Sequence, residues 1–557
     1  MIVLTRATCR IFLIIVTMTQ LTMTIDPSDV FCKGILLHTV QMARVFEDSK
    51  TFVDMKMKYP AQKILERFGN FMAKFHQNPS KHQVKQFVID NFDRNDTEFR
   101  KWNPKDWKEE PEFLKRIPNS NYRKFGIALH KTWKKLGRRI TKQVKNEIDR
   151  FSLIWVPNPV IVPGGRFREF YYWDSYWIIK GLIISGMTTT VRGMLDNYLY
   201  VVDKYGYIPN GGRLYYVGRS QPPMLIPSFK LYMDAKGDLE YLNKSILTLE
   251  KEFDFWLTKR TKTVKLDDKE YIMATYGDDS SGPRPESYAE DVDIASTLEK
   301  DEIKETFFTE MKAACESGID FSSRWFIANS TNKGSLLDIK TTSIIPVDLN
   351  AFLYGNAVIL SEFHQQLQNF ERADYYRNLA DRWLEAVERV LWHEEIGTWL
   401  DYDLINGVRR DYFYASNLAP LWTGCYNRKY EEEIVEKNLN YLDHKNIFNF
   451  PGGIPNSLEH TGEQWDFPNA WSPQQHMIIF GLKGTKNTEA QRVARELATK
   501  WLASNYEAYV RTKNMAEKYD CTIVGESGGG GEYKVQFGFG WSNGVILDIL
   551  VNFFSEN

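Results

Sequence analysis

The 557-residue sequence lacks the short motifs that mark metal-dependent hydrolases and nucleotide-binding proteins. It contains five cysteines, but no Cys-x-x-Cys pattern, no His-Glu-x-x-His pattern and no Walker lysine. Zinc hydrolysis and nucleotide phosphate binding depend on such spacings, so neither has support here. The glycine run from Gly528 to Gly531 is too bare to form a phosphate loop. We therefore expect neither a metal nor a cofactor.

An excess of charge of either sign is also missing. The chain carries 71 Lys and Arg residues against 72 Asp and Glu residues, which gives a formal net charge of -1. Nucleic acids and anionic membranes select strongly basic surfaces. Neither is expected as the main partner, and a small neutral ligand is favoured.

No apolar run is long enough to span a bilayer, which needs about 20 residues. Arg6 and Arg10 precede an apolar stretch over residues 11–18, and small polar residues continue to about Thr24. This order predicts a signal peptide over residues 1–24, without an Ala-x-Ala pattern to fix the cleavage point. The apolar stretch over 545–554 is also too short to span a bilayer. We expect a secreted, extracellular protein without a membrane anchor.

Linkers rich in proline, glycine and serine are absent, and 43% of the residues are hydrophobic. The sequence therefore predicts one large helical domain over residues 25–557, with an N-terminal helical extension to about residue 120. Four cysteines remain beyond the signal, and we expect buried free thiols rather than disulfides. Sequons at Asn95, Asn243 and Asn329 predict glycosylated surface positions.

Helical periodicity dominates the chain. Apolar residues recur every three or four positions from about 128 to 150, which predicts an amphipathic helix whose solvent-exposed face carries lysine and arginine. Further helices are expected over 174–184, 190–205 and 238–256, and a clear pair over 349–368 and 371–392. Strand-like alternation is scarce. Pair after pair of helices in one domain predicts an all-α toroid whose loops meet at one mouth.

One loop stands out among these connections. The stretch from Pro163 to Tyr176 interleaves aromatic residues with Arg166, Arg168, Glu169 and Asp174. A sugar ring packs its C–H face on an aromatic plane and binds its hydroxyls to charged donors and acceptors. A helix start with an aromatic core face is the alternative. The Pro-Gly-Gly turn before the charges favours a binding site.

Carboxylates in such loops suit glycoside hydrolysis, which uses one protonated and one ionised acid. Six acids are eligible, and spacing alone does not choose among them: Asp174, Glu286, Asp320, Asp466, Glu517 and Glu532. The stretch Gly525 to Gly529 matches the nucleophile elbow of serine esterases. That mechanism needs a later histidine, and the last one is His476, so we set the esterase aside.

Two long motifs resemble the signatures of the trehalases. The first is Pro163 to Tyr176, and the second is Gln464 to Pro473. Shorter matches are Pro209 to Gly211, Arg219 to Pro223, Arg284 to Glu286, Glu316 to Phe321, Glu517 to Asp520, Gly528 to Tyr533 and Gly538 to Gly544. The resemblance extends from about residue 120 almost to the C-terminus.

The resemblance implies an (α/α)6 barrel that hydrolyses α,α-trehalose to two glucose molecules with inversion and without a cofactor. By motif, Asp320 is expected to be the general acid and Glu517 the general base. The positions expected to bind substrate are Arg166, Phe167, Trp173, Asp174, Asn210, Arg219, Gln221, Arg284, Glu286, Gly318, Trp465 and Glu532.

The sequence departs from the family at Ile319, where trehalases usually carry tryptophan before the catalytic acid. Loss of an indole is expected to alter affinity or the pH optimum, because apolar surroundings keep an acid protonated. Two other functions stay open at this point. One is an inverting α-glucosidase for another sugar, and the other is a secreted sugar-binding protein without activity.

Overall fold

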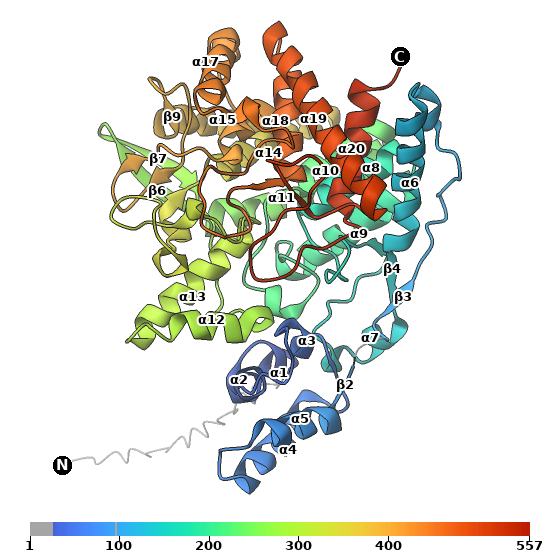
Figure 1. The fold of residues 1–557 in the computed structure, drawn as a ribbon, viewed down its shortest axis with the longest axis vertical. Coiled ribbons are helices and arrows are strands. Elements are labelled where there is room, and N and C mark those ends of the chain that lie inside the picture. Colours follow the sequence, from blue (N-terminus) through green and yellow to red (C-terminus); the bar gives the residue numbers. More distant parts are fainter. Residues whose placement is uncertain (1–25, 95–96, 557) are drawn as a thin grey trace, which may run out of the picture.

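The computed structural model describes residues 26–94 and 97–556 (Figure 1). The expected signal peptide and the sequon at Asn95 lie outside the described residues. Within this part of the chain, no helix is long and apolar enough to cross a membrane.

Six helices form a closed inner ring in which each contacts the next, and the last returns to the first. They are α8 (Asp174–Ile184), α10 (Leu225–Lys236), α14 (Val347–Gln366), α16 (Ala419–Thr423), α18 (Ser472–Lys483) and α20 (Gly540–Phe553). Several are apolar on all sides, because neighbours cover every face. In α20, twelve of fourteen residues are buried.

Six outer helices surround this ring. They are α6 (Ser120–Leu136), α9 (Thr188–Tyr205), α11 (Leu239–Lys259), α15 (Phe370–Val390), α17 (Glu431–His444) and α19 (Thr488–Thr512). The expected apolar stripe of the 371–392 helix is buried, from Tyr376 to Leu391. The predicted all-α toroid is confirmed.

The ring closes where α8 and α20 lie side by side (Figure 1). At Gly544 a Cβ atom would sit 2.0 Å from the carbonyl oxygen of Trp177, and at Gly181 it would sit 2.8 Å from the Cα of Gly544. No side chain can occupy either position without moving a helix. Two glycines therefore set the close approach of the first and last inner helices.

The helix predicted over 128–150 is wrong beyond its first part. Helix α6 ends at Leu136, and β4 (Gly137–Ile140) pairs between β3 (Phe99–Lys101) and β5 (Val160–Ile161). A Cβ at Gly137 would lie 2.1 Å from the carbonyl oxygen of Trp102. The chain turns into α7 (Lys142–Asn146) only after this strand. Ile140 and Val144 are buried as expected, but from different elements.

Strands are short, and most have two or three residues. The longest two form a hairpin of β6 (Thr261–Leu266) and β7 (Lys269–Ala274). Its two turn residues, Asp267 and Asp268, both have positive φ angles, as the favoured two-residue hairpin turn requires. The other short strands are β8 (Ile344–Ile345), β9 (Trp392–His393), β10 (Thr398–Trp399), β11 (Tyr402–Asp403) and β12 (Val408–Arg409).

The N-terminal part of the described chain has its own core below the toroid (Figure 1). It contains α1 (Ser28–Phe31), α2 (Gly34–Met42), α3 (Lys50–Val53), α4 (Ala61–Lys74), α5 (Lys81–Asn91), β1 (Lys56–Met57) and β2 (Phe92–Asp93). Tyr171, Tyr215 and Tyr216 from the toroid loops belong to the same core. The extension is therefore packed directly against the loops that the sequence marks as functional.

Candidate active site

One cavity at the mouth of the toroid gathers all fourteen residues that the sequence analysis assigned to catalysis or substrate binding. We call it the active-site cavity. Its walls come from the Pro163–Tyr176 stretch and from the loops before α10, α12 (Tyr288–Ala295), α18 and α20. Residues far apart in sequence thus converge as the toroid topology predicted.

A short strand pair links two of these loops. Strand β13 (Asn469–Trp471) runs antiparallel to β14 (Lys518–Asp520), with Trp471 opposite Lys518. Trp465 stacks on Trp471 with ring centroids 3.8 Å apart. The pairing holds the indole pair beside Glu517, which precedes β14.

Asp320 lies in the cavity wall after α13 (Asp301–Glu316). Burial raises the pKa of its carboxyl to about 7, and the positive charge of Arg284 opposes this shift. No side chain of the described residues donates a hydrogen bond to this carboxyl. An acid in such surroundings keeps its proton near neutral pH.

Glu517 faces the same cavity with different partners. Tyr533 donates its phenolic hydrogen to Oε1 across 2.9 Å, and the backbone N–H of Gln536 lies 3.2 Å from Oε2. Burial raises the pKa of Glu517 to about 7, while the charge of Lys518 and these two donors oppose the shift. The two hydrogen-bond donors favour the ionised form of this carboxyl and not that of Asp320, whereas the ammonium of Lys518 acts on both carboxyls.

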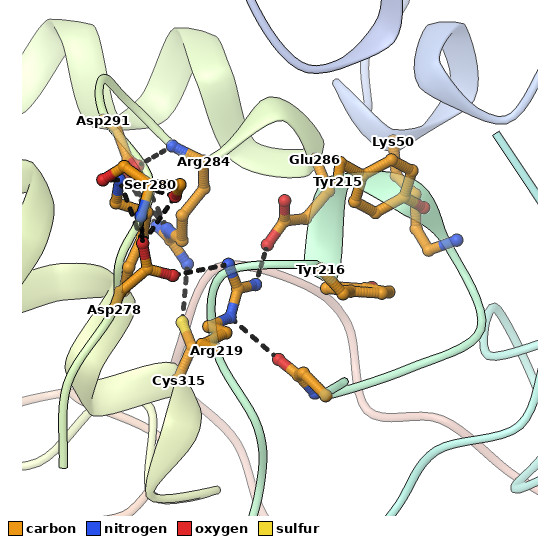
Figure 2. Close-up of polar contacts among 12 residues, drawn as sticks. Lys50, Tyr215, Tyr216, Arg219, Asp278, Ser280, Arg284, Glu286, Asp291 and Cys315 are labelled. Carbon is orange, nitrogen blue, oxygen red and sulfur yellow. Dashed lines mark hydrogen bonds and ion pairs between the residues drawn. The ribbon is translucent and has the colours of Figure 1, made fainter. Parts of the chain in front are cut away.

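Arg219 connects two predicted binding residues. Its Nη2 donates to Oε1 of Glu286 across 2.6 Å, and its Nε donates to Oδ1 of Asn210 across 2.9 Å. Figure 2 shows this guanidinium between Glu286 and Asp278, whose carboxylate is 3.9 Å away. The other oxygen of Glu286, Oε2, is buried and has no partner in the described chain. It is available to a ligand hydroxyl.

Arg284 is held by carboxylates on two sides. Its Nη2 lies 2.7 Å from Glu532, and both its Nε and its Nη2 donate to Asp291. The same guanidinium points toward the thiol of Cys315 (Figure 2), with 3.7 Å between Nη1 and Sγ. The positive charge is balanced before any ligand binds.

Arg166 is paired with the N-terminal extension. Its Nη2 lies 2.9 Å from both carboxylate oxygens of Asp48, which precedes α3. Its guanidinium also stacks over the ring of Tyr533 at 4.8 Å. Next to it, Lys50 of α3 pairs with Glu169 across 2.8 Å. The extension thus orients the first signature stretch from outside the toroid.

Asp174 is a third acid in the wall. Burial raises its pKa well above the usual range, and the nearby carboxylates of Glu517 and Asp320 add to the shift. It starts α8, immediately after Trp173. In its protonated form Asp174 can donate a hydrogen bond as well as accept one.

Gly318 and Gln221 position the indole of Trp173. Gly318 has a φ of +71°, and a Cβ there would lie 2.7 Å from the Trp173 ring. The side-chain oxygen of Gln221 accepts the backbone N–H of Trp173 across 3.2 Å. Glycine is thus needed both for the turn and for the close approach of the ring.

Ile319 is 1% exposed and does not line the cavity. Its carbonyl accepts a hydrogen bond from the indole of Trp325 across 2.8 Å. Asp320, which follows it, is partly buried.

The remaining eligible acid, Asp466, does not line the cavity. Its carboxylate accepts hydrogen bonds from the hydroxyls of Ser322, Ser323, Ser457 and Thr461. It therefore ties the second signature to the loop after Asp320. The Ser527 stretch also lacks the form of a nucleophile elbow, since the next helix begins only at Gly540.

Sequence reasoning missed several residues of the cavity wall: Tyr171, Tyr216, Ser287, Cys315, Gln464, Trp471, Tyr533, Phe539 and Trp541. Six of the nine stand inside motifs that it did identify, and five of those six are aromatic, so aromatic character was a usable signal. It also missed Lys518, whose ammonium lies 3.2 Å from Oε1 of Gln464. Burial lowers the pKa of this lysine to about 8.

The two described sequons, Asn243 and Asn329, are exposed. All four cysteines of the described residues are free, and three are buried. In residues 26–94 and 97–556 no cluster of three or more histidine, cysteine or acidic side chains could hold a metal ion.

Comparison with known proteins gives one consistent result. The model of the trehalase family matches residues 44–554. A trehalase of Apis mellifera is 53% identical over 94% of this chain and 84% of its own length. A Homo sapiens trehalase is 44% identical over 94% and 89%. Among solved structures, a neutral trehalase of Saccharomyces cerevisiae superposes with a TM-score of 0.59 at 25% identity, covering 70% of this chain and 73% of its own.

Proposed function

Because this chain belongs to the trehalase family, as a glycoside hydrolase acting on trehalose, we propose that it works by inversion, with Asp320 as general acid and Glu517 as general base. The observation that carries the proposal is the unequal hydrogen bonding of two carboxyls on one cavity. Glu517 accepts hydrogen bonds from Tyr533 and from the backbone of Gln536, whereas no side chain of the described residues donates to the carboxyl of Asp320. Such environments separate an acid from a base.

The roles follow from this difference. Protonated Asp320 gives its proton to the glycosidic oxygen as the bond to the anomeric carbon breaks. Ionised Glu517 takes a proton from the water that attacks the opposite face of that carbon. One glucose leaves with inverted configuration and the other keeps its own. The reaction consumes one water and leaves Asp320 ionised and Glu517 protonated until solvent resets them.

The rest of the wall suits a neutral disaccharide rich in hydroxyls. Arg166, Arg219 and Arg284 are each paired with a carboxylate, so they can donate hydrogen bonds without an unbalanced charge. Trp173 and Trp465 supply flat apolar faces, and we assign Phe167, Asp174, Asn210, Gln221, Glu286, Gly318 and Glu532 to the same two sugar-binding subsites. No metal or cofactor enters any step of this mechanism.

We also propose that the protein is secreted and glycosylated. The charged and apolar pattern of residues 1–24 supports a signal peptide. Exposure of Asn243 and Asn329 supports glycans at both positions. Expression in a secreting host, followed by mass spectrometry of the product, tests both points. Product that starts at Met1 and carries no glycan would contradict them.

Proton NMR of the purified protein with trehalose tests the mechanism. Equal initial amounts of α- and β-glucose are expected, recorded before the anomers interconvert. Two α-glucose molecules would mean retention, and then a covalent nucleophile. Maltose and sucrose run in parallel, because hydrolysis of either one would favour a broader α-glucosidase. No product from any sugar would favour a sugar-binding protein.

A further inference from the structure

A second cavity, of about 530 Å³, lies behind the loops that form the active-site cavity. It is bounded by the end of α6, by β4, by the start of the Pro163–Tyr176 stretch and by the chain on either side of Glu517. Phe167 lines both cavities. We call this space the basic cavity.

Four cations face the basic cavity without an ion-paired carboxylate in the described residues: Lys135, Arg138, Arg168 and Lys513. Arg138 donates only to the backbone carbonyls of Lys135 and Gly137. The acids of this wall, Asp54 and Glu98, lie against a fifth cation, Arg213, at 3.4 and 2.8 Å. The wall therefore carries a clear excess of positive charge.

The positive charge of one of these cations, Arg168, acts on another, Arg138. The pKa of the Arg138 guanidinium is lowered, first by burial and then by the positive charge of Arg168. Two guanidinium groups that line one cavity, neither of them paired with a carboxylate of the described residues, can both donate hydrogen bonds to one tetrahedral oxyanion. The arginines of the active-site cavity differ, because each already has a carboxylate partner.

The basic cavity is too large for a bare oxyanion and is partly apolar. Phe99, Leu136 and Phe537 line it together with the cations. We propose that it binds a small organic phosphate or sulfate monoester, such as a sugar ester. The oxyanion lies between Arg138 and Arg168, and the organic body packs on the apolar wall.

The basic cavity also shares its backbone with the catalytic loops. The N–H of Gly538 donates to the carbonyl of Met515 across 2.7 Å, two residues before Glu517. A Cβ at Gly164 would lie 2.8 Å from the carbonyl of Gly538, so the two loops touch. A bound ester therefore changes the KM for trehalose without entering the sugar subsites. This coupling rests on the proposed function, whereas the binding itself does not.

Isothermal titration calorimetry on the full chain tests the binding. The protein is the Asp320→Asn variant saturated with trehalose, so that the sugar subsites are filled. The probes are glucose 6-phosphate, glucose 6-sulfate, inorganic phosphate and glucose. We expect both esters to bind, inorganic phosphate to bind more weakly and glucose not to bind. Arg168→Gln and Arg138→Gln should each weaken ester binding by about tenfold or more, because each removes a charged donor.

Arg495→Gln is the matched control, since Arg495 is an exposed arginine of α19 outside the basic cavity. It should leave ester binding unchanged. Equal binding of glucose and its esters, or ester binding that survives both cavity substitutions, would overturn the proposal. Inorganic phosphate binding as tightly as the esters would overturn the organic part of it.

Steady-state kinetics of the wild type then test the coupling. Glucose 6-phosphate should change the KM for trehalose in the wild type and in Arg495→Gln, and should lose this effect in Arg168→Gln. An effect that remains in Arg168→Gln would place the ester in the sugar subsites and overturn the coupling. A protein that binds esters but does not hydrolyse trehalose would contradict the proposed function alone.

Discussion

The phenol of Tyr533 donates a hydrogen bond to the carboxylate of Glu517 across 2.9 Å, while the face of the same ring lies against the guanidinium of Arg166 at 4.8 Å. One side chain thus contacts both the proposed base and a proposed substrate-binding arginine. Hydrogen bonds to a carboxylate stabilise its ionised form. Tyr533 therefore helps to keep Glu517 ready to accept a proton from water.

Tyr533→Phe should shift the acidic limb of the kcat/KM profile to higher pH. The acidic limb reports ionisation of the base, and removing a donor to the carboxylate raises its pKa. Profiles of wild type and variant with trehalose measure the shift. Tyr375→Phe, at an exposed position on α15, is the control and should leave the limb in place. An unmoved limb in Tyr533→Phe would show that the hydrogen bond does not tune the base.

Asp320→Asn and Glu517→Gln should each lower kcat by about 10²- to 10⁴-fold, the usual contribution of general acid–base assistance. Both amides match the size of the carboxyl they replace, so circular dichroism should stay unchanged. Asp301→Asn, on an exposed acid at the start of α13, should keep full activity. Near-normal turnover in either cavity variant would mean that its carboxyl has another role.

Asp320→Asn should also change how stability depends on pH. Burial raises the pKa of this carboxyl from 3.8 to about 7, so the folded protein holds the proton more tightly than the unfolded chain does. The corresponding stability is present below pH 3.8 and is lost as the pH rises toward about 7. Asparagine does not ionise, so the variant should melt a few degrees (on the order of 2–5 °C) higher at pH 8.

At pH 4 the Tm values of variant and wild type should approach each other, because the wild-type carboxyl is then largely protonated. Thermal scans at both pH values test this prediction. Equal Tm differences at pH 4 and pH 8 would show that ionisation of Asp320 is not the cause.

Asp48→Asn should raise the KM for trehalose more than it lowers kcat. Asp48 holds Arg166 by two contacts of 2.9 Å, and the neutral amide would leave the guanidinium free to turn away. Steady-state kinetics give both constants. Asp93→Asn is the control in the same N-terminal extension, because Asp93 is exposed and its nearest cation is 3.7 Å away. Equal effects of the two substitutions would remove Asp48 from substrate binding.

Ile319→Trp should shift the alkaline limb of the profile to higher pH, because more apolar bulk beside Asp320 disfavours its ionised form. The site is 1% exposed, so the larger ring should also cost about 1–3 kcal/mol of stability. The pH profile and a denaturant titration separate the two effects. A lowered stability with an unmoved limb would show that residue 319 acts through packing alone.

Much of the toroid could be predicted from periodicity, because its inner helices are continuous and apolar. The helix predicted over 174–184 matches α8 residue for residue. The helix predicted to reach residue 150 fails because Gly137 begins a strand that pairs with distant segments. Such pairing depends on a close backbone approach to Trp102, which no local pattern reveals.

In the active site, too, the sequence predicted some features, and contacts between distant segments determined the others. Motif resemblance selected fourteen residues, and all of them line one cavity. It did not indicate that Asp48, from the extension, would hold Arg166, because that contact joins segments more than a hundred residues apart. Nor did it assign a role to Lys518, which stands inside the motif from Glu517 to Asp520 and is buried. The positions of Asp48 and Lys518 depend on contacts between segments that are distant in sequence.

The closure of the ring by α20 has a consequence for biosynthesis. Helix α8 is synthesised early, but it cannot pack against α20 until nearly the whole sequence has left the ribosome. Trp541 of α20 also donates its indole N–H to the backbone carbonyl of Glu517 across 2.9 Å, so the base is anchored only after that point. Until then the apolar faces of the inner helices stay uncovered, which makes the nascent chain prone to aggregation. A chain that terminates before α20 should therefore be inactive and should bind chaperones through its uncovered apolar faces, rather than show reduced activity.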